Sequence, residues 1–132
     1  MRNRHSYHRW LFATLAAATA CSSATAVCTL IGCESGVTVH LSALPSGPFH
    51  VEVKPSGASD VRYVFDCTGA SDCRQDIFFP GLITEDVIVT VTVGSASKQT
   101  QVSNLAYESQ RPNGADCPPD CRTVTVVAQI PT

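Results

Sequence analysis

Hydrophobic and polar residues alternate along several short stretches of the chain, which is the pattern of half-buried β-strands. In DVIVTVTV (86–93), valines at the odd positions alternate with isoleucine or threonine at the even ones. The same period of two runs through other stretches: VTVHLSA (37–43), FHVEVKP (49–55), VRYVFDC (61–67) and RTVTVVAQI (122–130). DIFFPGL (76–82) and KQTQVSNLAYES (98–109) complete the set.

Turn-forming segments such as LPSGP, SGASD and GSAS separate these stretches, and no long helical period occurs. The pattern predicts an all-β fold, an antiparallel two-sheet sandwich (Ig-like) of about seven strands. Because side chains alternate between faces, Val87, Val89, Val91 and Val93 are expected to point into the core.

The beginning of the chain has the organisation of a secretory signal peptide. Arg2, Arg4 and Arg9 precede an apolar run of eleven residues, Trp10 to Ala20, which is too short to span a bilayer. A buried N-terminal helix is the competing interpretation, but the run has no polar face and leads into small residues.

Two cleavage sites compete after this run. Ala18-Thr19-Ala20-Cys21 resembles a bacterial lipoprotein signal, which implies lipidation of Cys21 and attachment to the membrane through an N-terminal lipid anchor. Ser22 implies sorting to the outer membrane by the same resemblance, whereas a cut after Ala26 gives a freely secreted protein. We favour Cys21, which divides the chain into a signal peptide (1–20), a tether with a first disulfide loop (21–35) and a sandwich domain (36–132).

Six cysteines are left for pairing whether Cys21 is lipidated or removed by a cut after Ala26, and an even number in an exported chain indicates a disulfide framework. These are Cys28, Cys33, Cys67, Cys73, Cys117 and Cys121. The last two, in CPPDC, lack both the two-residue spacing and the following helix of a thioredoxin site, and no C-x2-C knuckle for zinc is present. We expect three local bridges, Cys28–Cys33, Cys67–Cys73 and Cys117–Cys121; a distant partner for Cys33 is the alternative.

Few residues suggest a metal-binding or other functional site. His40 and His50 project from the polar faces of neighbouring strands, which places Glu52 across from His40. They are either a surface metal site or two exposed histidines, and we favour the second interpretation. The cluster Asp66, Asp72 and Asp76 offers calcium ligands on a rigid loop, but its spacing does not match an EF-hand, and solvated carboxylates are the preferred interpretation.

The sequence argues against several function classes. No GxSxG elbow or free thiol nucleophile stands out, so we expect no enzyme and no cofactor. Without the three signal arginines the chain has six basic and eleven acidic residues, a net charge of −5, which argues against a nucleic-acid partner.

DIFFPGLITEDVIVTVTV (76–93) resembles a segment of transthyretin-like and carboxypeptidase-regulatory-like sandwiches, with Leu82 in the leucine position. The whole chain resembles small, cysteine-stapled bacterial lipoproteins with an Ig-like domain. This resemblance implies an envelope location and a non-catalytic module with a structural or binding role toward an envelope protein or glycan. Two alternatives remain: a secreted small-ligand or metal-binding module using the Asp-rich loop, and a protease-inhibitor-like domain using the bridged loop 67–73.

Overall fold

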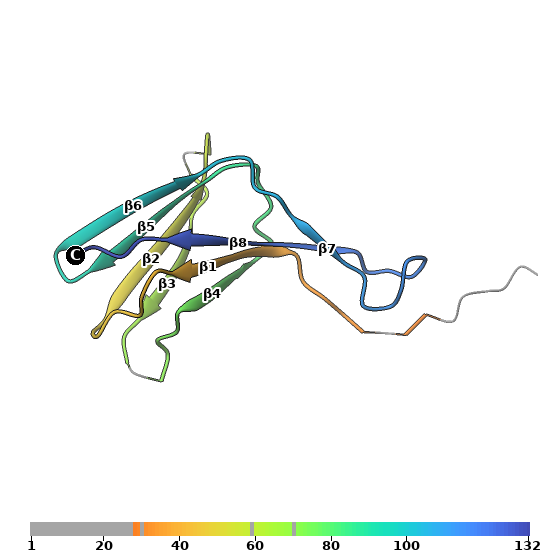
Figure 1. The fold of residues 1–132 in the computed structure, drawn as a ribbon, viewed down its shortest axis with the longest axis horizontal. Coiled ribbons are helices and arrows are strands. Elements are labelled where there is room, and N and C mark those ends of the chain that lie inside the picture. The colour runs from red at the N-terminus through yellow and green to blue at the C-terminus, as the bar shows by residue number, and fades with distance from the viewer. Residues whose placement is uncertain (1–27, 30, 59, 70) are drawn as a thin grey trace, which may run out of the picture.

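Eight β-strands make up the fold, as seen in a computed structural model that describes residues 28–132 except 30, 59 and 70 (Figure 1). The strands are β1 (Gly36–Leu41), β2 (Phe49–Pro55), β3 (Tyr63–Cys67), β4 (Asp76–Pro80), β5 (Val87–Val93), β6 (Ala96–Val102), β7 (Glu108–Gln110) and β8 (Cys121–Ala128). No helix occurs among the described residues, so the predicted all-β class is confirmed.

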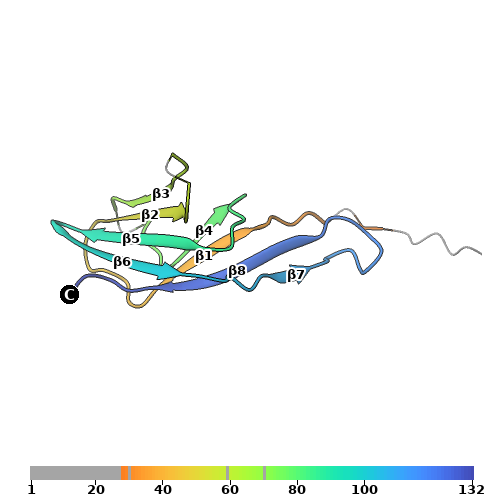
Figure 2. The same cartoon turned by 90° about the horizontal axis from the view of Figure 1, so that it is seen from above.

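Two four-stranded sheets face each other, with strand orders β4-β1-β8-β7 and β3-β2-β5-β6 (Figure 2). This arrangement confirms the predicted two-sheet sandwich. Neighbouring strands are antiparallel except β1 and β8, which run parallel. The stretch 98–109, which the sequence indicated as one strand, is divided between β6 and β7 at Asn104, where φ is 57°.

The core lies between the sheets and consists mainly of branched aliphatic side chains. Val87, Val89 and Val91 of β5 are each 0% exposed, which confirms the predicted inner face, while Val93 is only partly buried. Burial of each such side chain stabilises the fold by about 1.5–3 kcal/mol before the entropy cost of ordering the chain. The alternation of apolar and polar residues along each strand therefore determines which face of each sheet packs against the other sheet.

β7, the connection 111–120 and the beginning of β8 extend beyond the sandwich as an arm, on the side away from the C-terminus (Figures 1 and 2). Tyr107 fixes the base of this arm: its hydroxyl donates to the carbonyl of Thr84 and accepts from the backbone N–H of Thr84, both at 3.0 Å. The nearby backbone N–H of Leu105 donates to the carbonyl of Glu85 at 2.8 Å. These bonds tie the arm to the connection between β4 and β5.

A close packing contact lies where β1 begins. Gly36 is buried, and a Cβ built there would come within 2.4 Å of the carbonyl oxygen of Phe79 and 2.8 Å of the Phe78 ring. Only glycine therefore fits at this position without a shift of β4.

Candidate functional site

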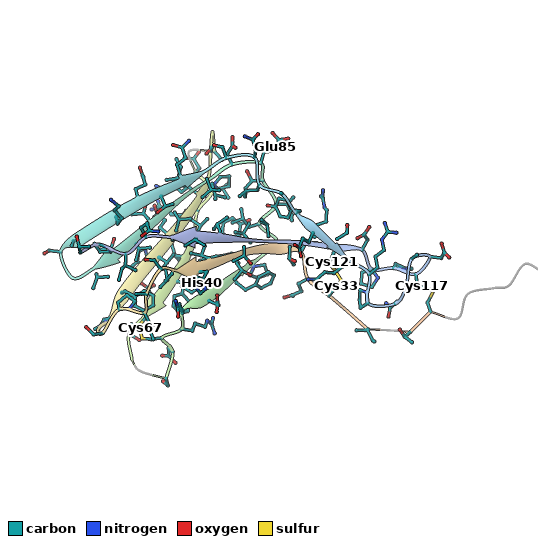
Figure 3. The ribbon with its side chains drawn as sticks, viewed as in Figure 1. Cys33, His40, Cys67, Glu85, Cys117 and Cys121 are labelled. Carbon is teal, nitrogen blue, oxygen red and sulfur yellow. A yellow bond between two sulfur atoms is a disulfide. The ribbon has the colours of Figure 1, made fainter. Side chains whose placement is uncertain are left out.

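Two long-range disulfides join the segment before β1 to the arm (Figure 3). Cys28 is bonded to Cys117 and Cys33 to Cys121, with Cα–Cα distances of 5.5 and 6.0 Å and sequence separations of 89 and 88. The predicted local bridges Cys28–Cys33 and Cys117–Cys121 are therefore wrong, and Cys33 has a distant partner, as the alternative prediction had it. The third prediction, Cys67–Cys73, is confirmed, with a Cα–Cα distance of 4.9 Å.

The parallel pairing of β1 with β8 explains this connectivity. Gly36 lies opposite Thr123, an offset of 123 − 36 = 87 residues. Continuing that offset toward lower residue numbers from both strands brings the two cysteine-containing segments side by side. The bonded cysteines are accordingly separated by close to 87 residues. The backbone N–H of Arg122 donates to Oγ of Ser35 at 3.0 Å, again with an offset of 87. The disulfides therefore continue the β1–β8 pairing into the arm.

The side-chain amide of Asn113 forms a clamp that links the arm to the described part of the predicted tether, segment 28–35, and the word tether means this segment from here on. Its Oδ1 accepts from the backbone N–H of Ile31 at 3.1 Å and from the Thr29 hydroxyl. Its Nδ2 donates to the carbonyls of Ile31, at 2.9 Å, and Pro118, at 2.7 Å. All four hydrogen bonds depend on one side chain, so Asn113 links the tether to the loop that carries Cys117.

The two histidines do not form a common site. β1 and β2 belong to different sheets, so the predicted position of Glu52 near His40 is wrong. His40 lies within 2.7 Å (Nδ1 to Oδ1) of Asp76 on one outer face. His50 lies within 2.6 Å of Asp66 on the other. The hydrogen bond from Lys54 lowers the pKa of Glu52, and the nearby charges of Lys54, Arg62 and His50 add to this effect.

The aspartates likewise do not converge. Asp66 and Asp76 are each paired with a histidine on opposite outer faces, and Asp72 accepts a hydrogen bond from Ser71 in the loop. In the part of the chain that the structure describes, no three His, Cys, Asp or Glu side chains are grouped to hold a metal ion. The calcium interpretation of this cluster therefore has no geometric support.

His40 acts as a cross-strand link. The side-chain amide of Gln75 lies 3.3 Å from Nε2 of His40 and also donates to the carbonyl of Leu41 at 2.8 Å. With Nδ1 facing Asp76, both ring nitrogens have partners, so the ring joins β1 to the beginning of β4.

A groove of ≈ 330 Å³ lies at the end of the sandwich opposite the arm, between the β1–β2 connection and the β3–β4 loop. The Cys67–Cys73 bridge fixes one of its walls (Figure 3). None of the described residues that line this groove is charged; they are Leu44, Pro45, Ser46, Gly47, Pro48, Thr68, Gly69 and Cys73. Leu44 is 49% exposed at the groove.

A second hollow of ≈ 280 Å³ adjoins the groove, since both include Pro48 and Thr68. It reaches the pair of His50 and Asp66, and Thr92 on β5. Neither hollow was predictable from the sequence, because LPSGP indicates only a turn, and loop segments distant in sequence form the walls.

The fold and these features define a small β-sandwich with a disulfide-stapled arm at one end and a loop-lined groove at the other. Three disulfides are typical of an extracellular or exported protein. No family model matches the chain, and neither a curated protein nor a solved structure was found to be similar to it.

The predicted signal peptide and both cleavage sites, including Cys21, lie outside the described residues. Within residues 28–132, leaving aside the three gaps, there is no helix of the length and hydrophobicity needed to cross a membrane.

Proposed function

We propose that this protein is a non-catalytic lipoprotein of the bacterial envelope, which presents the groove at its loop end to a partner protein. The observation that carries the proposal is the pair of bridges from Cys28 and Cys33 to the arm. Cys28 is only seven residues after Cys21, so a lipid on Cys21 would hold the arm near the membrane surface. The groove lies at the opposite end and would face outward.

The lining of the groove favours an apolar side chain of a partner protein as its occupant. Uncharged residues of two loops, held by two prolines and a disulfide, form a pocket that loses little entropy on binding. Leu44, half-exposed at its rim, supplies apolar contact area of the kind that interface centres use.

A protease-inhibitor-like role is the second candidate. The observation in its favour is that Leu44 stands exposed beside Pro45, against the loop that the Cys67–Cys73 bridge closes. In this role the same loops would insert into a protease instead of receiving a side chain.

Cys21→Ser is expected to abolish acylation and membrane retention, because the hydroxyl cannot take the place of the thiol that carries the lipid. Membrane partition and intact mass of the mature protein measure both effects, with Ser22→Ala as the matched control that keeps the anchor. Unchanged membrane partition of the Cys21 variant would overturn the lipoprotein assignment. A mature chain that begins at Val27 would show that the cut follows Ala26.

A photo-cross-linking side chain at Ser46 is expected to give a discrete protein adduct in intact cells. Leu44→Asp should reduce the yield of that adduct at least several-fold, because a carboxylate at the rim opposes entry of an apolar group. The same probe at Gln99, on the outer face of β6, is the control. Adducts that are identical from both positions, or insensitive to Leu44→Asp, would contradict a binding role for the groove.

A further inference from the structure

The clamp residue Asn113 is followed directly by Gly114 in the arm. Gly114 has a positive φ of 97°, and its backbone N–H donates to the carbonyl of Arg111 at 3.0 Å. The loop is further held by Arg111, whose guanidinium lies 3.0 Å from the carboxylate of Asp120. In the folded arm, the side-chain amide of Asn113 and the backbone nitrogen of Gly114 are therefore both hydrogen-bonded.

An asparagine followed by glycine can lose its amide spontaneously. The backbone nitrogen of the glycine loses its proton and attacks Cγ of the asparagine, forming an N–Cγ bond, while the Cγ–Nδ2 bond breaks and the departing NH2 group takes up a proton to leave as ammonia. Water then opens the cyclic imide to aspartate or isoaspartate. Glycine favours this step because it has no Cβ to hinder the approach and adopts the required backbone conformations easily.

We propose that Asn113 is a conditional deamidation site, protected while the tether is docked and modified once the tether is released. In the docked state, rotation of the side chain toward Gly114 would break its hydrogen bonds to Ile31 and Pro118. The attacking nitrogen would also have to leave the carbonyl of Arg111. Both requirements disappear when the arm opens locally.

The modification would prevent the clamp from forming again. An aspartate at position 113 has no N–H to donate to the carbonyls of Ile31 and Pro118, and its charge would lie against these two oxygens. A deamidated residue 113 would therefore show that the tether had been released, and it would hinder renewed docking of the tether onto the arm. The inference does not depend on lipidation or on a partner in the groove.

Peptide mapping of the processed, oxidised protein in mildly alkaline buffer tests the proposal through the mass increase and isoaspartate content at Asn113. Cys28→Ala/Cys117→Ala is expected to deamidate on the order of ten-fold faster than wild type, because the clamp's hydrogen bonds then open more readily. Ile31→Pro keeps every bridge but removes one donor to Asn113, and it should also accelerate the reaction. Cys67→Ala/Cys73→Ala, at the other end of the sandwich, should match the wild-type rate.

Equal rates in wild type and in both tether variants would overturn the proposal, provided that circular dichroism shows each variant folded. So would a wild-type rate as fast as that of a free peptide spanning 110–117. In the converse experiment, Asn113→Asp should raise amide exchange at Ile31, and an unchanged exchange rate would mean that the clamp does not hold the tether.

Discussion

Replacing Val91 with aspartate is expected to prevent folding. Val91 is 0% exposed in β5, between Val51 on β2 and Lys98 on β6, and its side chain points between the sheets. A carboxylate there would be buried without a partner, at a cost of roughly several kcal/mol. That cost is comparable to the whole stability of an ordinary domain, about 5–15 kcal/mol. Circular dichroism and urea unfolding of the purified variant measure the effect.

Thr92→Asp is the matched control, one residue along the same strand. Thr92 lies on the outer face, where its hydroxyl is 2.9 Å from that of Ser97 and His50 is its neighbour on β2. The new carboxylate stays in water, so a loss of no more than about 1 kcal/mol is expected. Similar unfolding in both variants would contradict the observed register, since a shift of one residue exchanges the two faces.

Strand positions and faces were predictable because they depend on local alternation. Val87, Val89 and Val91 share one parity, and burying them is the only arrangement that removes the apolar face of β5 from water. β7 was not predictable as a separate strand, because its three residues, Glu108–Gln110, are all exposed and show no alternation. It exists because β8 supplies backbone partners along the arm.

Sheet order was not predictable, since it depends on contacts between segments far apart in sequence. Consecutive strands β1 and β2 occur in different sheets, which separates His40 from His50 and Glu52. The parallel contact between the first and last strands likewise decides the disulfide partners. Each of these cysteines has a nearby cysteine in sequence, so spacing alone favoured local bridges. Only Cys67 and Cys73, which close a loop between strands β3 and β4, follow that local logic.

The candidate site was less predictable than the core. Asn113 was not predicted to be a site residue, because its role arises from four contacts, three of them to the tether more than eighty residues away. The groove is formed by loops whose composition indicates turns, and its shape depends on how two connections pack. Periodicity carries information about strands and none about the relative placement of loops.

Removing both long-range bridges is expected to cause the second large loss of stability. Cys28–Cys117 closes a loop with a sequence separation of 89, for which chain entropy gives about 4–5 kcal/mol. Cys33–Cys121 lies close to it in both segments, so once the first bridge exists the second closes only a small additional ring and adds about 2 kcal/mol. Replacing all four cysteines with alanine should therefore lower the free energy of unfolding by about 6–7 kcal/mol.

Cys67→Ala/Cys73→Ala provides the comparison, since its bridge spans a separation of six residues and should contribute only about 2 kcal/mol. Either long-range bridge removed alone should cost about 2 kcal/mol, because the other still closes nearly the same large loop. Urea unfolding of the four variants therefore tests a specific non-additivity: two small single losses and a large combined one. Losses of stability that add up, or a combined loss no larger than that of the short bridge, would show that the two long-range bridges do not close the same large loop. Such a result would contradict the joint stapling of the tether to the arm.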